Sequence, residues 1–215
     1  MRFAKGCISY VVVPFLIFLL IFIPGVVTGM VLMEALGLLF LLIAAGLVVF
    51  FRDPELPIGD GIVSPANGKV FAVDTIDDTR IVRIFMNVWN IHVNRSPMDG
   101  VVSEVEHRPG GHIPAFDKDA ETNERVIVHY DTSIGKVKTV QIAGSVARRI
   151  VPYISGGEKL KKGDKIGIIR LGSRVDVHLP KEKVSITCAI GDVVVPGQTI
   201  ANIILDQNLG EGGDT

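Results

Sequence analysis

Residues 8–51 form one almost continuous apolar stretch, and this stretch constrains the fold more than any other feature of the chain. Glu34 is its only charged residue. A helical membrane span needs about 20 residues, so the stretch is too long for one span. It therefore predicts two short transmembrane helices joined by a turn around Pro24–Glu34. This hairpin would make residues 1–52 a membrane anchor.

Basic residues flank the apolar stretch on both sides, with Arg2 and Lys5 before it and Arg52 after it. Lys and Arg next to membrane spans favour the cytoplasmic side, so both ends of the hairpin are predicted to lie in the cytoplasm, together with the domain that follows. A cleaved signal peptide is the competing interpretation. The stretch is too long for one, and no small-residue cleavage site follows a short apolar core.

After the anchor the composition changes to short β-rich runs separated by Gly, Pro, Asn and Asp, which predicts a mainly β domain over residues 53–209. Gly61–Val70 contains an Asn-Gly pair typical of a β-hairpin. Arg125–Tyr130 and Val137–Ile142 predict a second hairpin. Residues 145–150 fit either a strand or a helical turn. The polar, Gly-rich residues 210–215 are predicted to be disordered.

Two segments resemble each other, Ile154–Asp164 and Ile190–Thr199. Both follow the pattern G-(D/E)-x-(V/L)-x-x-G-(D/Q), which is typical of tight turns in lipoyl-like, barrel-sandwich domains. The lysine that such carrier domains modify is missing from the expected hairpin, so a carrier function is disfavoured. The pattern predicts a barrel-sandwich (lipoyl-like hybrid) β domain of about ten short strands.

Charge and cysteine content argue against two classes of partner. The formal net charge is −1, so there is no bulk electrostatic attraction to nucleic acid. Cys7 and Cys188 are the only cysteines, and neither has a neighbouring Cys or His at metal-ligand spacing. We expect neither nucleic-acid binding nor a metal site.

The alternation of apolar and polar residues over Gly167–Pro180 predicts strands on both sides of Gly172-Ser173. A Gly within a strand pattern usually marks a bulge or a close backbone approach, so spacing alone favours a bulged pair in a sandwich. The pair also suits self-cleavage, because a Ser hydroxyl can attack the preceding carbonyl and Gly leaves that path free of a Cβ.

Leu171-Gly172-Ser173, followed by Arg174 and Asp176, resembles the self-cleavage site of the phosphatidylserine decarboxylases. In that family the chain breaks between the Gly and the Ser, and the Ser becomes an N-terminal pyruvoyl group. This ketone reacts with a substrate amine and acts as an electron sink, as pyridoxal phosphate does elsewhere. The resemblance implies a pyruvoyl cofactor derived from Ser173 and two fragments, 1–172 and 173–215, that stay associated.

Four further stretches resemble the short, membrane-anchored branch of that family, in order along the chain: Val63–Gly68 (V-S-P-A-D-G in the family), Asn90–Pro97 (D-V-H-V-N-R-x-P), Asn123–Arg125, and Ile142–Gly144 with Ala147–Val151. The resemblance covers the whole chain, including the apolar hairpin. It implies a self-cleaving proenzyme that decarboxylates a serine phospholipid, either phosphatidylserine or archaetidylserine, to the ethanolamine phospholipid.

The resemblance also implies roles for single residues. His92 would take the proton from Ser173 and later protonate the substrate carbon. Arg95 could hold a phosphate by a bidentate contact. Phe116 could line the lipid entrance, and His112 lies in the loop of the family's substrate contacts. The alternative for each is structural: a packed histidine, an ion-paired arginine, a phenylalanine packed within its loop.

One position departs from the family pattern, because Asn67 stands where the motif has Asp. That carboxylate is expected to orient the catalytic histidine and stabilise its charge, which an amide cannot do. The departure predicts slow self-processing and faster processing for Asn67→Asp. Two alternatives would supply a carboxylate: Asp60 or Asp99 as a nearby substitute, or deamidation of Asn67 to Asp, which the following Gly makes easier.

A rival function from another class is a membrane-tethered barrel-sandwich module that binds or assembles partners without catalysis. The two functions differ in one observable property, since only the enzyme would split between Gly172 and Ser173. A strand-rich domain with exposed edges could also pair as a homodimer.

Overall fold

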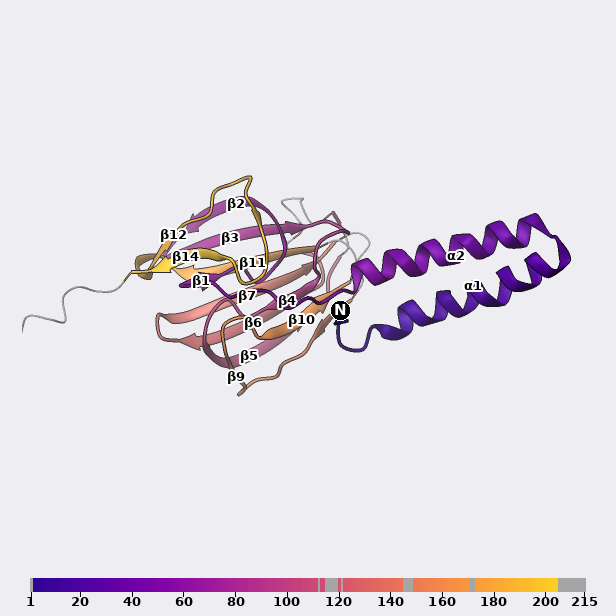
Figure 1. The fold of residues 1–215 in the computed structure, drawn as a ribbon. Coiled ribbons are helices and arrows are strands. Elements are labelled where there is room, and N and C mark those ends of the chain that lie inside the picture. Colours follow the sequence, from indigo (N-terminus) through magenta and orange to yellow (C-terminus); the bar gives the residue numbers. More distant parts are fainter. Residues whose placement is uncertain are drawn as a thin grey trace, which may run out of the picture.

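The computed structural model describes residues 2–111, 113–114, 120, 122–144, 149–170 and 173–204. Two helices, α1 (Ile8–Thr28) and α2 (Val31–Phe50), form a hairpin that projects from one end of a β domain (Figure 1). The mainly β fold with an N-terminal helical hairpin is confirmed. The predicted disordered tail and residues 145–148 lie outside the described residues.

The turn of the helical hairpin is shorter than the sequence predicts. Only Gly29 and Met30 separate the helices, and Gly29 ends α1 in the left-handed conformation with a φ of 71°. Pro24 lies inside α1 and does not end it. The Thr28 hydroxyl donates a hydrogen bond to the Pro24 carbonyl at 2.8 Å, which helps to satisfy the backbone there. The helix therefore continues through Pro24, and the turn lies within the predicted range Pro24–Glu34 but takes only two residues.

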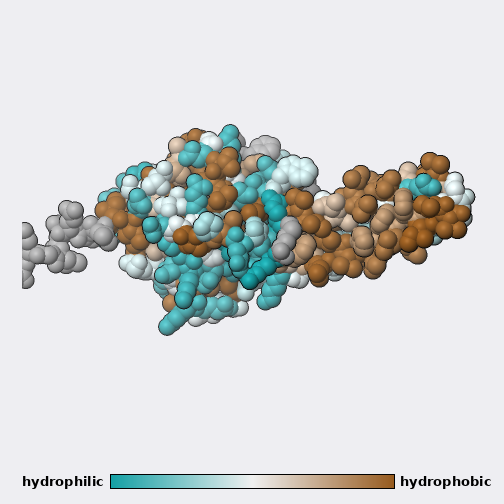
Figure 2. Space-filling model, viewed as in Figure 1, coloured by the Kyte–Doolittle hydropathy of each residue, from teal (hydrophilic) through white to brown (hydrophobic). Residues whose placement is uncertain are grey.

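Glycines let the two helices approach closely. A Cβ added at Gly37 would lie 2.7 Å from the Phe22 Cβ, and one added at Gly25 would lie 3.0 Å from the Met33 Cβ. Figure 2 shows that the outer surface of the hairpin is hydrophobic, in contrast to the mixed surface of the β domain. Each helix is long and apolar enough to cross a membrane, and only 11% of its apolar window is buried. A core helix of a soluble domain would be mostly buried.

The β domain is built on a curled sheet (Figure 1). The sheet has eight antiparallel strands in the order β13-β2-β3-β11-β7-β6-β5-β9. Its strands are β2 (Gly68–Ile76), β3 (Thr79–Met86), β5 (Gly100–Arg108), β6 (Arg125–Thr132), β7 (Gly135–Ala143), β9 (Lys159–Leu160), β11 (Ser173–Pro180) and β13 (Val193–Val194). The predicted hairpin of β6 and β7 is confirmed.

Two three-stranded sheets complete the domain, with the orders β1-β14-β12 and β4-β10-β8. Their strands are β1 (Ile62–Val63), β14 (Thr199–Ile203), β12 (Val184–Ile186), β4 (Val93–Arg95), β10 (Lys165–Ile169) and β8 (Ile150–Pro152). A short 3₁₀ helix, Lys181–Lys183, follows β11.

The predicted Asn-Gly hairpin in Gly61–Val70 is wrong. Strand β1 pairs with β14, and β2 begins at Gly68 and pairs with β3. Gly68 is needed for a close approach between strands, because a Cβ there would lie 2.1 Å from the Phe85 carbonyl oxygen. Gly68 is therefore required by the packing of β2 against β3 and not by a turn.

The two similar segments do form similar turns. Gly157 and Gly163 in the first, and Gly191 and Gly197 in the second, all have positive φ. Each turn is closed by a side chain that accepts a backbone N–H three residues earlier; the acceptors are Glu158, Asp164, Asp192 and Gln198. The repeated pattern in the sequence is thus a repeated turn in the structure.

The main core lies against one face of the eight-stranded sheet. Val175, Val177 and Leu179 of β11 belong to it. Because side chains alternate along a strand, Ser173 points to the same face, and Arg174 and Asp176 point to the other. This register places the serine of the predicted cleavage site inside the domain.

Candidate active site

Ser173 begins β11, the fourth strand of the eight-stranded sheet, and its side chain is fully buried. It is paired with Met86 of β3 on one side and Ala143 of β7 on the other. Its Oγ donates to the Met86 Sδ at 3.4 Å, a weak contact. Gly172, the other half of the predicted cleavage site, lies outside the described residues.

His92 lies just before β4, in contact with the last turn of the anchor. Its ring is fully buried and packs on the Phe50 ring at a centroid distance of 4.0 Å. Nδ1 lies 2.9 Å from the Asn90 carbonyl oxygen. A carbonyl can only accept, so in neutral His92 the proton sits on Nδ1 and Nε2 carries the lone pair. No described residue offers this buried Nε2 a hydrogen-bond partner.

The electrostatic surroundings keep His92 neutral. Burial lowers its pKa from 6.5 to about 4, and the hydrogen bond to Asn90 opposes this shift only in part. The positive charge of Arg52 lowers the pKa further. Near pH 7 the imidazole is therefore uncharged, and its free Nε2 can accept a proton.

His92 and Ser173 lie at the same end of the domain, the end nearest the helices. The His92 carbonyl accepts a hydrogen bond at 3.3 Å from the backbone of Ile169, the last residue of β10, and Ser173 follows four positions later. No hydrogen bond joins the two side chains among the described contacts. The chain segment that connects Ile169 to Ser173 includes the predicted cleavage site.

A buried polar layer lies beside Ser173, and sequence reasoning gave its members no role. The Asn94 side chain contacts the same Met86 sulfur at 3.7 Å and accepts a 2.7 Å hydrogen bond from the Gln141 side chain. Gly167 of β10 leaves room for the Gln141 side-chain amide, because a Cβ at position 167 would lie 3.2 Å from the nitrogen and oxygen of that amide. In the sequence, the one sign of this layer is a polar Gln next to apolar residues in β7.

Asn67 binds the backbone beside His92, and among the described hydrogen bonds none joins its side chain to the imidazole. Its Oδ1 accepts from the Ile91 N–H at 3.0 Å, and its Nδ2 donates to the Val194 carbonyl at 3.0 Å. Among the described contacts neither suggested substitute reaches His92, and Asp99 accepts instead from the backbone of Lys162. The amide therefore holds the segment that carries His92, and the ring's own partner is the Asn90 carbonyl.

Arg95 is buried in an ion pair at the exit of the anchor. Its Nη2 donates to the Asp53 carboxylate and to the Pro54 carbonyl, both at 2.9 Å, and its Nη1 donates to the Gly163 carbonyl at 3.2 Å. Lys165 of β10 also pairs with Asp53. The guanidinium is thus occupied in joining the anchor to β4 and β10, which does not support the expected open phosphate site. His112 and Phe116 lie outside the described residues.

An apolar cluster joins the helix ends to the same sheet. Phe50 and Phe51 of the anchor pack with Val93 of β4 and Ile168 of β10. The site is therefore built where the hairpin meets the domain. In the part of the chain that is described, no group of three or more His, Cys, Asp or Glu side chains is placed to hold a metal ion.

Comparison with known proteins finds a consistent set of relatives. A family model described as phosphatidylserine decarboxylase matches residues 43–202. A phosphatidylserine decarboxylase proenzyme of Streptomyces avermitilis is 52% identical over 159 residues, which cover 73% of this chain and 74% of the relative. A Methanococcoides burtonii protein with the provisional name archaetidylserine decarboxylase proenzyme is 43% identical over 200 residues, covering 92% of this chain and 94% of the relative.

Proposed function

The chain belongs to the phosphatidylserine decarboxylase family and is a decarboxylase, and from this premise we propose that it is a self-cleaving proenzyme. It makes a pyruvoyl group from Ser173 and uses it to convert a serine phospholipid to the ethanolamine phospholipid. The observation that carries the proposal is a buried, neutral His92 with a free Nε2, at the end of the domain where Ser173 begins β11.

The residues present fit a pyruvoyl group at position 173. The Ser173 hydroxyl has only a weak contact with the Met86 sulfur, so it remains available as a nucleophile. A serine hydroxyl needs a base to become a good nucleophile, and the unpartnered Nε2 of His92 is the candidate for this base. The surrounding side chains exclude water, which favours attack by the chain itself over simple hydrolysis.

Self-cleavage then proceeds by steps that the chain supplies. His92 Nε2 accepts the Ser173 Oγ proton as the oxygen bonds to the Gly172 carbonyl carbon. It returns this proton to the Ser173 nitrogen as the C–N bond breaks, so an ester replaces the peptide bond. His92, neutral again, takes the Ser173 Cα proton as the Cβ–O bond breaks, which frees the Gly172 carboxylate and leaves dehydroalanine. Water then replaces the nitrogen, which leaves as ammonia, and the pyruvoyl group remains.

In turnover, a pyruvoyl group at position 173 would supply a ketone for the substrate amine and an electron sink for the loss of carbon dioxide. His92 holds and returns protons at Nε2. Its low pKa makes protonated His92 a strong donor to the carbon that has lost its carboxylate. Asn67 acts as a positioning residue, because it fixes the Ile91 backbone next to His92.

The two fragments are expected to stay associated after cleavage. Strand β11 would begin the small fragment, and it is hydrogen-bonded to β3 on one side and β7 on the other. Strand β14 pairs with β1 of the large fragment. These ladders and the shared core do not depend on the peptide bond at 172–173.

The membrane arrangement follows from the hairpin. We infer that both helices cross the bilayer, and the basic residues at their outer ends favour a cytoplasmic position for residues 53–215. A substrate confined to the bilayer surface would then meet a site built at the helix ends. Family membership decides against the rival non-catalytic binding module.

The proposal is tested by carbon dioxide release. Purified full-length protein in detergent, given phosphatidylserine or archaetidylserine labelled in the serine carboxyl, should release label from at least one of them. Ser173→Ala should release none. A Ser173→Ala protein as active as wild type would overturn the proposal.

A further inference from the structure

The loop between β3 and β4 exposes two large apolar side chains. Val88 is 43% exposed and Trp89 is 67% exposed. The loop is nevertheless fixed by its own hydrogen bonds. Asn87 accepts from the Trp89 N–H at 2.9 Å through its side chain, and its own N–H donates to the Asn90 side chain at 2.8 Å. An ordered loop thus holds an indole ring outward.

This loop lies at the level where α2 leaves the apolar hairpin. Arg52 directly follows the last turn of α2, and its Nη2 donates to the Trp89 carbonyl at 2.6 Å. Its Nη1 donates to the Val49 carbonyl within α2. One guanidinium therefore connects the helix end to the loop, and His92 follows Asn90, the last residue of the loop, by two positions.

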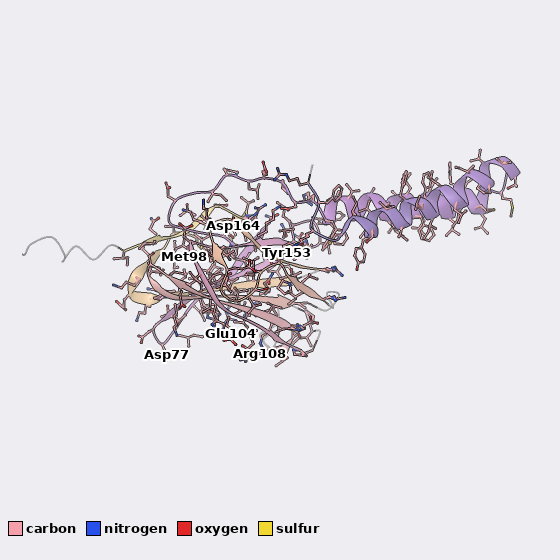
Figure 3. All side chains as sticks on the ribbon, turned by 90° about the horizontal axis from the view of Figure 1, so that it is seen from below. Asp77, Met98, Glu104, Arg108, Tyr153 and Asp164 are labelled. Carbon is pink, nitrogen blue, oxygen red and sulfur yellow. The ribbon has the colours of Figure 1, made fainter. Side chains whose placement is uncertain are left out.

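The other amphipathic aromatic side chains gather at the same junction. The chain has one Trp and three Tyr, four in all. The Tyr10 hydroxyl accepts from Arg170 at 2.8 Å, and Tyr153 donates to the Lys5 carbonyl at 3.5 Å. Figure 3 shows Tyr153 in the half of the domain nearer the helices. Only Tyr130 is elsewhere, buried in the core. Three of the four thus lie at the junction, and arginine guanidinium groups bind the Tyr10 hydroxyl and the Trp89 carbonyl. Aromatic and basic residues together are the pattern that membrane proteins show at the bilayer surface.

We infer that the Asn87–Asn90 loop enters the headgroup region of the bilayer that the hairpin spans, with Trp89 and Val88 as a further membrane contact of the catalytic domain. The inference rests on the membrane anchoring in the proposed function. The hairpin packs on the domain through Phe50 and Phe51, so the two can only tilt together relative to the bilayer. Contact through this loop fixes the tilt and turns the end that carries His92 toward the lipid surface.

The lone Trp makes the test direct, because its fluorescence reports this loop alone. Full-length protein is reconstituted in phosphatidylcholine vesicles, in which a fraction of the lipid carries bromine either near the headgroup end of its chains or near the bilayer centre. We expect Trp89 emission to be quenched, and more strongly by bromine near the headgroups. Emission that bromine at neither depth quenches, from protein that floats with the vesicles, would overturn the inference.

A matched control moves the probe to the opposite end of the domain. Ile76 is 51% exposed, and it precedes Asp77, which Figure 3 shows at the end away from the helices. In Trp89→Phe with Ile76→Trp, bromine should not quench the emission. Equal quenching of both probes would contradict a specific contact by the loop. Protein that fails to float with the vesicles would instead contradict the anchoring itself.

Discussion

At the residue scale, burial of His92 has a consequence that pH can reveal. Its pKa is about 4 in the folded chain and 6.5 in an exposed histidine. A base that must be neutral works only above its own pKa, so the rate of self-cleavage should stay nearly constant from neutral pH down to about pH 5 and fall near pH 4. Time-resolved mass spectrometry of freshly synthesised chain measures this rate. A fall centred near 6.5 would show that the base is an exposed histidine.

The same shift makes stability depend on pH. Between 6.5 and about 4 the unfolded chain binds a proton at His92 and the folded chain does not, so stability is lost as the pH falls through this range. The loss should approach about 3 kcal/mol, at 1.36 kcal/mol per pKa unit. Urea unfolding in detergent at several pH values should show it in wild type, and a smaller loss in His92→Gln. An equal loss in His92→Gln would assign the effect to other groups.

Asn67 allows a test in which resemblance and geometry predict opposite results. The family pattern predicts that Asn67→Asp speeds cleavage. The structure predicts that the new carboxylate loses the donation to the Val194 carbonyl and faces that oxygen at about 3 Å. We therefore expect a lower free energy of unfolding, by about 1–3 kcal/mol, and no faster cleavage. Faster cleavage at unchanged stability would restore the role of a carboxylate at this position.

At the element scale, the exit of the anchor depends on one buried ion pair. Asp53→Asn removes the charge that Arg95 and Lys165 share, and breaking such a pair typically costs about 3–5 kcal/mol. Unfolding in detergent measures the loss. Glu55→Gln is the matched control, because the pair of Glu55 with Arg2 is exposed and its removal should leave stability nearly unchanged.

A second variant separates the two roles considered for Arg95. Arg95→Met in the Asp53→Asn background removes the uncompensated charge and should restore part of the lost stability. If this double variant folds as well as wild type but fails to turn over lipid, Arg95 contacts the substrate. If lipid turnover falls only in proportion to the loss of stability, Arg95 has the structural role alone.

Local sequence patterns identified the elements that depend on local interactions. The helical hairpin, the β6–β7 pair and the repeated turns each arise from neighbouring residues. The errors arose where distant chain segments decide. Strand β1 pairs with β14, from the far end of the domain sequence, and Gly68 is required by its approach to β3. A local turn signal cannot report such long-range packing.

In the candidate site, too, the sequence predicted single residues but not the contacts between distant segments. The motifs identified His92 and Ser173 as the residues to examine. They did not identify Phe50, which packs on the imidazole from the anchor, or Met86 and Gln141, which reach the site from other strands. Nor did they show that Arg95 is occupied by Asp53. These contacts exist only after β3, β4, β7 and β10 have assembled.

At the scale of the whole molecule, the charge pattern predicts the side of the membrane. Protease added to intact cells, or to vesicles that keep the cell's orientation, should leave residues 53–215 intact, because the flanking basic residues predict that both hairpin ends face the cytoplasm. Permeabilised cells supply the control, since there the domain must become accessible. Digestion of the domain without permeabilisation would reverse the orientation.

The possible homodimer stays a prediction, and the sheet edges bear on its form. In the described chain the eight-stranded sheet ends in β13 and β9, each of only two residues. Edges this short give little template for pairing with another chain. If copies associate, a face of the domain or the helices is the better surface for it.

If the chain cuts itself at Ser173 and converts that residue to a pyruvoyl group, the intact mass of the purified protein must show it. Wild type should give two fragments, 1–172 and 173–215, the smaller one lighter by one ammonia than hydrolysis would leave it. Ser173→Ala should give one uncut chain, and Ser185→Ala, which alters an exposed serine of β12, should be cut like wild type. An uncut wild type that still releases carbon dioxide, or a Ser173→Ala chain cut at the same bond, would contradict the claim.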